Sequence, residues 1–208
     1  MKSGIKAMIG DAMFRFNPLE KYLPINSSTI ALFQKMVPTW QQIEQAIEKE
    51  NWVESLVLLQ RWLQFHPKDG QAWYKLGDIC YLMMNFEEMA KCFLNALKYD
   101  TTHESDIKKK KEISWSFLIS EGIKFNREKD EEQALRNFIL AAKILPERFI
   151  AYKLAGETAY NIGNLYSAQD LLKKALNIQP NDAECRTIYN DLFKLLSSAN
   201  RPTGMNIK

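Results

Sequence analysis

A pattern of small and large residues recurs four times along this chain, and it constrains the fold more than any other feature. In each copy a large apolar residue stands four positions after the first residue. A turn residue, usually proline, stands twelve positions after the same first residue. The copies are Ser55-Leu59-Trp62-Pro67, Met89-Phe93-Ala96-Thr101, Ala134-Phe138-Ala141-Pro146 and Ala168-Leu172-Ala175-Pro180. Their spacings are 34, 45 and 34 residues, so the longer step is one repeat plus an insertion of 11. A fixed period of this size predicts a stack of similar units.

A second recurring spacing places another residue twelve positions before each start. Three of these four residues are glycine (Gly77, Gly122 and Gly156), although the chain has only 8 glycines among 208 residues, and the fourth is Ile43. Small residues on two antiparallel helices let the helices approach closely, and the large residue fills the space beside them. Proline then ends the second helix, because it has no N–H to continue the helical hydrogen bonds. Each unit is therefore predicted to be a helical hairpin that buries its apolar face by stacking on its neighbours.

The residues around these positions resemble the tetratricopeptide repeat family, whose 34-residue unit has the pattern W-x-x-L-G, then A-x-x-x-F-x-x-A, then proline. Trp73-Tyr74-Lys75-Leu76-Gly77 is a close match, and so is the segment from Gly163 to Ala168 followed by Pro180. The first unit departs most from the pattern. The resemblance implies an all-α fold, a right-handed superhelical solenoid of four helical hairpins, with units at 36–69, 70–103, 115–148 and 149–182.

The segments that flank the repeats are predicted to be helical extensions. Residues 183–198 should form a C-terminal capping helix that begins after Asn181-Asp182, and residues 199–208 should form a disordered tail. Residues 1–35 should form an N-terminal helical extension. Its apolar residues share one helical face: Ile5, Met8, Ile9, Ala12, Met13 and Phe16.

The N-terminal helix has two interpretations. It either caps the first unit or anchors the chain on a partner protein, because short apolar faces usually pack against protein. Alternatively, residues 1–16 lie on a membrane surface as an interfacial helix, since their Met and Phe side chains oppose Lys and Arg. The sequence leaves both interpretations open.

The insertion at 104–114 carries a run of four lysines. With Ser105 or Asp106 as a cap, it should lengthen the first helix of the third unit by about three turns, and this longer helix is predicted to project from the stack. We interpret the run as a solvated face, and the alternative is a contact with phosphate or an acidic peptide. The basic insertion consists of Lys108, Lys109, Lys110 and Lys111. No aromatic residues alternate with the lysines, so nucleic acid is not an expected partner.

Composition and scattered reactive residues argue against an enzyme. Lys and Arg number 28 against 25 Asp and Glu, a balance too even to indicate a nucleic-acid binder. The two histidines, His66 and His103, fall at repeat turns, and the sequence has no glycine-rich phosphate loop. The three cysteines match neither a disulfide framework nor a zinc pattern. We expect no catalytic residue, no metal and no cofactor, and a cytoplasmic protein, peripheral to a membrane if residues 1–16 bind lipid.

The family resemblance also supplies candidate binding residues, because the first helix of each unit lines a concave groove in this architecture. Aromatic and aliphatic residues with a few charges between them suit a peptide anchored by apolar contacts. The mixed signs of the charges favour a ligand that is neither strongly acidic nor strongly basic. The predicted groove residues are Trp40, Tyr74, Lys75, Asp78, Tyr81, Ile119, Ile123, Arg127, Lys153, Glu157, Tyr160 and Asn161.

Chaperone-binding members of the family hold a partner's C-terminal carboxylate with a clamp of Lys, Asn and Arg. The residues at the matching positions here are Trp40, Glu44, Lys75, Ser116 and Ser120. The chaperone carboxylate clamp is therefore absent, and a co-chaperone role of that type is not expected. The leading hypothesis is a non-enzymatic adaptor or scaffold that binds a segment of a protein partner in the groove. The alternatives are a permanent structural subunit of a larger complex and a membrane-associated assembly factor that uses the N-terminal helix.

Overall fold

The computed structural model of the chain describes residues 37–199, so the predicted N-terminal extension at 1–35 lies outside the described residues. The predicted tail at 199–208 also lies outside them, except for residue 199, which ends the last helix. All regular secondary structure between residues 37 and 199 is helical. The described residues divide into two compact units, 37–105 and 106–199. The helices are α3 (Trp40–Glu48), α4 (Trp52–Phe65), α5 (Gly70–Leu82), α6 (Phe86–Tyr99), α7 (Glu104–Arg127), α8 (Glu131–Ile144), α9 (Phe149–Asn161), α10 (Leu165–Ile178) and α11 (Ala183–Ala199).

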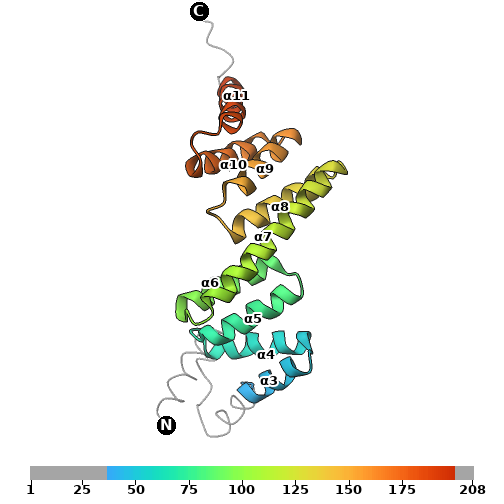
Figure 1. The fold of residues 1–208 in the computed structure, drawn as a ribbon, viewed down its shortest axis with the longest axis vertical. Helices are drawn as coiled ribbons and strands as arrows, with labels where there is room; N and C mark the ends of the chain where they lie inside the picture. The colour runs from blue at the N-terminus through green and yellow to red at the C-terminus, as the bar shows by residue number, and fades with distance from the viewer. Residues whose placement is uncertain (1–36, 200–208) are drawn as a thin grey trace, which may run out of the picture. The chain divides into compact units, whose positions relative to one another are not determined.

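Consecutive helices pair as hairpins within each unit, as Figure 1 shows for α5 with α6 and for α9 with α10. In the first unit, α4 also packs against the neighbouring α5 and encloses a core with it. In the second unit, α9 packs against α8 as well as α10, and α11 covers α10. These hairpins confirm the predicted all-α fold of stacked helical pairs.

The glycines of the repeat lie where the two helices of a hairpin come closest. A Cβ atom added at Gly122 would lie within 3.0 Å of the ring of Phe138, which is fully buried. The same close approach occurs between Gly77 and the ring of Phe93. Glycine on the first helix and a large residue on the second thus form one interlocking contact, as the sequence spacing predicted.

The turn inside each hairpin has the same backbone form. Three residues join the two helices; the second of them has a positive φ, and the third caps the second helix with its side chain. At the α7–α8 turn, Lys129 has a φ of 63°, the Asp130 N–H donates to the carbonyl of Phe125 at 2.9 Å, and the Asp130 side chain accepts from the backbone N–H of Gln133. Asp130 therefore caps α8, and Glu131 and Glu132 occupy the first turn of that helix. Between residues 37 and 199, the residues with a positive φ are Glu50, Met84, Lys129 and Gly163.

The helix of the insertion, α7, is longer than the other first helices, as predicted. It has 24 residues, whereas α5 and α9 have 13 each. It begins at Glu104, so the predicted caps Ser105 and Asp106 lie inside the helix. The prediction of a projecting, solvated extension is wrong at Ile107, which is 1% exposed. The lysines around Ile107 suggested a fully solvated helix, but one buried side chain per turn is enough to fix the position of a helix.

The capping helix α11 starts where the sequence predicted. Asp182 accepts a hydrogen bond from the backbone N–H of Cys185 at 2.8 Å, and Leu192 and Leu196 are buried with Cys185. Leu195, by contrast, is 50% exposed. It is adjacent to Leu196 and points about 100° away from it, because an α-helix turns by that angle per residue.

The interlocking contact generates a first prediction. Replacing Gly122 with Val should lower the free energy of unfolding by about 1–3 kcal/mol, because the buried Phe138 ring has no room to move. Helix propensity alone would favour Val over Gly by a few tenths of a kcal/mol. Urea unfolding measures the difference. The matched control is Ser120→Val on the exposed side of the same helix, which should change stability by less than about 0.5 kcal/mol. Equal effects at both positions would contradict the interlocking contact.

The recurring turn generates a second prediction. Met84 has a φ of 57°, a left-handed conformation that costs a residue with a Cβ about 1 kcal/mol. Its side chain is 55% exposed, so little packing is lost on its removal. Met84→Gly should therefore raise the midpoint of urea unfolding. Met83→Gly is the matched control, because Met83 has an ordinary φ of −82° and should lose stability. A fall in stability for both variants would show that the turn is not strained.

Candidate functional site

The predicted groove residues of the first unit lie on α3 and α5, and their aromatic rings pack against other residues of that unit. Trp40 lies 5.4 Å from Trp62, measured between ring centroids, and its indole N–H donates to Glu44 at 3.0 Å. The Nζ of Lys75 lies 6.0 Å from the centre of the Trp40 ring. These contacts place Trp40 and Lys75 together at the edge of the first core.

Tyr74 is held between two rings. It stacks on His103, with 3.7 Å between ring centroids and 8° between ring planes, and its other neighbour is Phe93 at 6.2 Å. The remaining two predicted residues of this unit, Asp78 and Tyr81, are half-buried on α5. The aromatic side chains of the first unit therefore fill space between its own helices.

The predicted residues of the second unit lie on α7 and α9 and are more accessible. Ile123 is 37% and Tyr160 is 42% exposed, and Ile150, which the sequence analysis did not select, is 45% exposed. Ile119 is half-buried against a core formed by α8 and α9. We call this surface the α7–α9 face; its residues are Ile119, Ile123, Arg127, Ile150, Lys153, Glu157, Tyr160 and Asn161.

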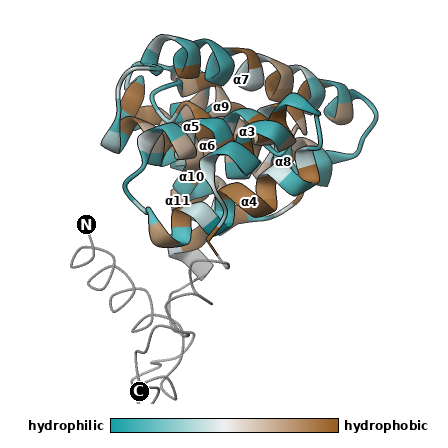
Figure 2. Cartoon of the chain, turned by 90° about the horizontal axis from the view of Figure 1, so that it is seen from below, coloured by the Kyte–Doolittle hydropathy of each residue, from teal (hydrophilic) through white to brown (hydrophobic). Residues whose placement is uncertain are grey.

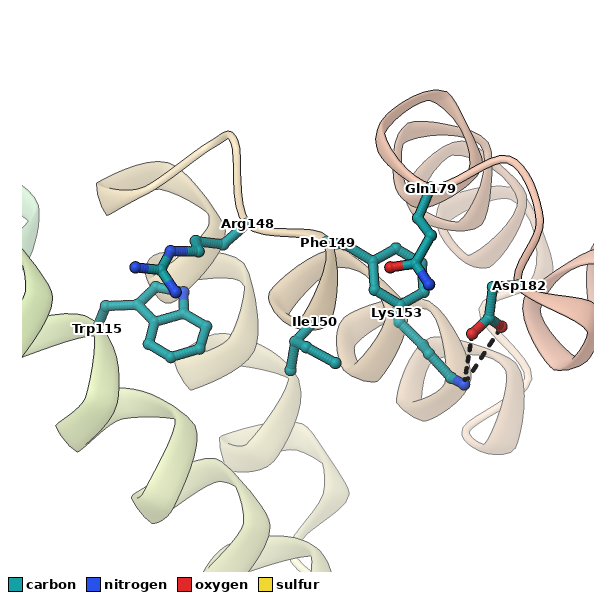
Figure 3. Close-up of a pocket in the computed structure, with 7 residues that line it drawn as sticks. All are labelled: Trp115, Arg148, Phe149, Ile150, Lys153, Gln179 and Asp182. Atoms are coloured by element: carbon teal, nitrogen blue, oxygen red, sulfur yellow. Dashed lines mark hydrogen bonds and ion pairs between the residues drawn. The ribbon is translucent and has the colours of Figure 1, made fainter.

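A pocket of about 310 Å³ lies at one end of the α7–α9 face, and Figure 3 shows its walls. Trp115 of α7 and Phe149 and Ile150 of α9 supply apolar walls. Charged and polar side chains form the rest of the pocket wall. The lining residues are Trp115, Arg148, Phe149, Ile150, Lys153, Gln179 and Asp182.

Arg148 forms one side of the pocket and is held by two groups of α7. Its guanidinium group lies 5.3 Å from the centre of the Trp115 ring and forms an ion pair of 2.6 Å with Glu112. The indole N–H of Trp115 is buried and donates no hydrogen bond within the described residues. Arg148 is therefore positioned by both an aromatic face and a carboxylate.

Lys153 forms the other side and lies among three carboxylates. Its Nζ is 2.7 Å from Glu184, 3.3 Å from Asp182 and 3.8 Å from Glu157. Hydrogen bonding to Glu184 raises the pKa of Lys153, so its ammonium group stays charged. The pKa of Asp182 is lowered by the backbone N–H of Cys185 and then by Lys153. Figure 3 shows Lys153 directed at Asp182 across the pocket wall.

Glu157 is the member of this cluster with the poorest interactions. Burial raises the pKa of Glu157, and the neighbouring Lys153 opposes that shift. Its Oε1 atom is buried and has no hydrogen bond, because the Nζ of Lys153 at 3.8 Å is too distant for one. The folded chain therefore holds this carboxylate in an environment that disfavours its charge.

The histidines and cysteines have structural surroundings. The ring of His66 packs at a tilt against Trp62, with 4.1 Å between ring centroids, and burial lowers the pKa of His66. All three cysteines are buried, and burial raises the pKa of Cys185 to about 11, so its thiol is protonated at neutral pH. Between residues 37 and 199, no group of His, Cys, Asp and Glu side chains could hold a metal ion, and no helix is long and apolar enough to cross a membrane.

The basic insertion is not uniform. Lys108 and Lys109 are exposed, whereas Lys110 is largely covered and forms an ion pair of 2.7 Å with Asp106. Lys111 is half-buried. The two exposed lysines alone are therefore accessible to a partner on all sides, and the four do not act as one cationic surface.

Sequence reasoning found Lys153 but missed most of the pocket. A usable signal was present, because the missed residues occupy equal positions of adjacent repeats. Trp115 and Phe149 are 34 residues apart, as are Arg148 and Asp182. Residues at the first and last positions of a unit lie close together where one hairpin joins the next, so the repeat register could have located these pocket residues.

Comparisons with known proteins gave one family match and several solved structures of low similarity. A tetratricopeptide repeat family model matches residues 70–103. No curated protein matches the chain. Among solved structures, PilF of Pseudomonas aeruginosa is 18% identical over 76% of this chain and 67% of its own, with a TM-score of 0.37. A TPR repeats protein of Bacteroides fragilis is 15% identical over 74% of this chain and 96% of its own, with a TM-score of 0.38. YrrB, described as a TPR protein with an unusual peptide-binding site, is 16% identical over 81% of this chain and 98% of its own, with a TM-score of 0.33.

The strained carboxylate of Glu157 generates a third prediction. A carboxyl group whose pKa is raised by folding destabilises the fold at neutral pH, and that cost disappears as the pH falls through the raised pKa and below the ordinary value of 4.5. Glu157→Gln should therefore raise the melting temperature at pH 7, and the difference from the parent chain should shrink toward pH 4.

Glu184→Gln provides the control for this prediction. Its side chain is 69% exposed, so its replacement should leave the melting temperature unchanged or slightly lower at pH 7. Circular dichroism melts between pH 4 and pH 7 compare the two variants. A lower melting temperature for Glu157→Gln at pH 7 would mean that its ion pair with Lys153 outweighs the cost of burial.

Proposed function

We propose that this tetratricopeptide repeat protein is a non-enzymatic adaptor or scaffold that binds a segment of a partner protein on its α7–α9 face. Tetratricopeptide repeat proteins typically mediate protein–protein interactions, and this scaffold is usually non-catalytic. The α7–α9 face offers the two components that a peptide site needs, accessible apolar side chains and an adjoining pocket.

The observation that carries this proposal is the exposure of three apolar side chains on neighbouring first helices. Ile123, Ile150 and Tyr160 are each more than a third exposed on the same face. Apolar surface left in water costs free energy, and a partner segment would recover it on binding. The pocket beside Ile150 can receive one side chain of the segment, which would fix its register.

The predicted residues of the first unit have a different role in this proposal. Trp40 and Tyr74 already make ring contacts inside their unit, so a ligand gains less by covering them. We propose that they position α3 and α5 and that they contribute to binding only through their exposed edges. Lys75 and Tyr81 remain candidates for peripheral contacts.

A specific observation favours the second candidate, a permanent subunit of a larger complex. Val53 is 66% exposed and Val57 46% exposed, and they lie one turn apart on α4. Much of α4 is coloured as hydrophobic in Figure 2. A lasting interface on this second helix would bury the pair. The third candidate, a membrane-associated assembly factor, rests on residues 1–16, which lie outside the described residues.

A crosslinking experiment tests the proposed function. A photoreactive amino acid at position 150 should crosslink a partner in cells, and mass spectrometry would identify it. In calorimetric titrations with that partner, Ile123→Ala and Tyr160→Ala should each weaken binding by about 1–3 kcal/mol, because exposed apolar anchors dominate such interfaces. Melting temperatures should stay close to that of the parent chain.

Val57→Ala is the matched control, since Val57 is as exposed as Ile150 but lies on α4. It should leave the affinity unchanged. Crosslinks that form from position 57 and not from position 150, with unchanged affinity in the Ile123 and Tyr160 variants, would reject the α7–α9 face. The permanent-subunit candidate would then replace it.

A further inference from the structure

The ionic contacts of the pocket reveal a charge imbalance that the sequence alone conceals. The sequence predicts that Lys153 is an available cation on the α7–α9 face, but in the structure three carboxylates surround it. Arg148, the other cation of the pocket, is paired with Glu112. The carboxylates in contact with these two cations outnumber them by four to two. The four are Glu112, Glu157, Asp182 and Glu184, of which Asp182 lines the pocket itself and the other three contact its cations from outside the lining.

This imbalance determines which sign of charge the pocket can accept from a ligand. An acidic side chain would have to compete with carboxylates that already hold Lys153 and Arg148, and it would be repelled by them. A basic side chain would be attracted by these carboxylates and would share Glu184 with Lys153. Glu184 is the member best placed to meet it, because its side chain is 69% exposed while its oxygen lies 2.7 Å from Lys153.

The apolar walls determine what accompanies the charge. Trp115, Phe149 and Ile150 line a volume of about 310 Å³, at the lower end of the range for ligand sites, about 300–1,000 Å³. Such a volume suits one bulky side chain rather than a small-molecule cofactor. Figure 3 shows Arg148 beside Trp115 at one end of the pocket, Lys153 beside Phe149 at the other end, and Ile150 between them, so an inserted side chain would have a charged group near each end.

We propose that the pocket end of the α7–α9 face selects a partner segment in which a bulky aliphatic or aromatic residue is closely followed or preceded by Lys or Arg. This inference rests on the proposed function and adds the chemistry of the partner. It also revises the sequence-based expectation of a neutral ligand, because that expectation counted Lys153 as free to balance Glu157. The bulky residue fills the pocket, and the cation lies beside Glu184.

Selection from random peptides tests the proposal and does not require the partner to be identified first. A phage library of random seven-residue peptides is selected on the full-length chain, after depletion on an Ile150→Asp variant whose fold is checked by circular dichroism. Peptides that pair a bulky apolar residue with Lys or Arg should be enriched. Enriched peptides that are acidic, or that show no preference for charge, would overturn the inference and leave the proposed function standing. If no peptide requires the intact face, the proposed function fails and the inference fails with it.

Affinities of the best enriched peptide locate its cation. Glu184→Gln should weaken binding about fivefold at low salt, the effect of losing roughly 1 kcal/mol, and the difference should shrink at high salt. The matched control is Asp191→Asn on the same helix, which removes one exposed carboxylate outside the cluster and should change the affinity by less than about twofold. An equal response of the two variants would mean that overall charge, and not the pocket, selects the peptide.

Discussion

The contact between a glycine on the first helix and a large side chain on the second is the constraint on which the rest of the structure depends. At Gly122 the absent side chain brings α7 against the ring of Phe138, and no other residue would leave that space. The contact sets the distance between the helices of a hairpin, and the recurring turn sets their direction. Together they decide which sides of the first helices pack on a neighbour and which sides remain for binding.

The fold was predictable because its signals are local and repeated. The positions of Gly77 and Phe93, or of Asp130 before α8, can be read from spacing and from helix-capping chemistry. The burial of Ile107 and the exposure of Leu195 could not be read in this way. Both depend on which surface faces the helix, and a periodic pattern does not contain that information.

For the candidate site, the sequence predicted which residues lie on the first helices but not the surroundings of their side chains. Register on the first helices selected Tyr74 and Lys153, but their environments come from residues distant in sequence. His103 covers Tyr74 from beyond the second helix of its hairpin, and Glu184 reaches Lys153 from the capping helix. Because of these contacts, Tyr74 is a packed ring and not the exposed aromatic anchor that the sequence suggests. Lys153 likewise lies at the centre of an acidic cluster and is not a free cation.

Within each repeat, different positions maintain the hairpin and form the accessible surface. One position of the repeat is occupied by side chains of four different chemical types. In successive repeats these are the indole of Trp40, the phenol of Tyr74, the aliphatic side chain of Ile119 and the ammonium group of Lys153. The hairpins tolerate this variety because the close approach of their helices is made elsewhere, at Gly156 and Leu172 in the last repeat. A change at Lys153 can therefore alter what the surface binds while the helices stay in place. The acidic surroundings of Lys153 connect α9 to the start of α11 through Asp182 and Glu184, whereas the contact that joins α9 to α10 does not involve them.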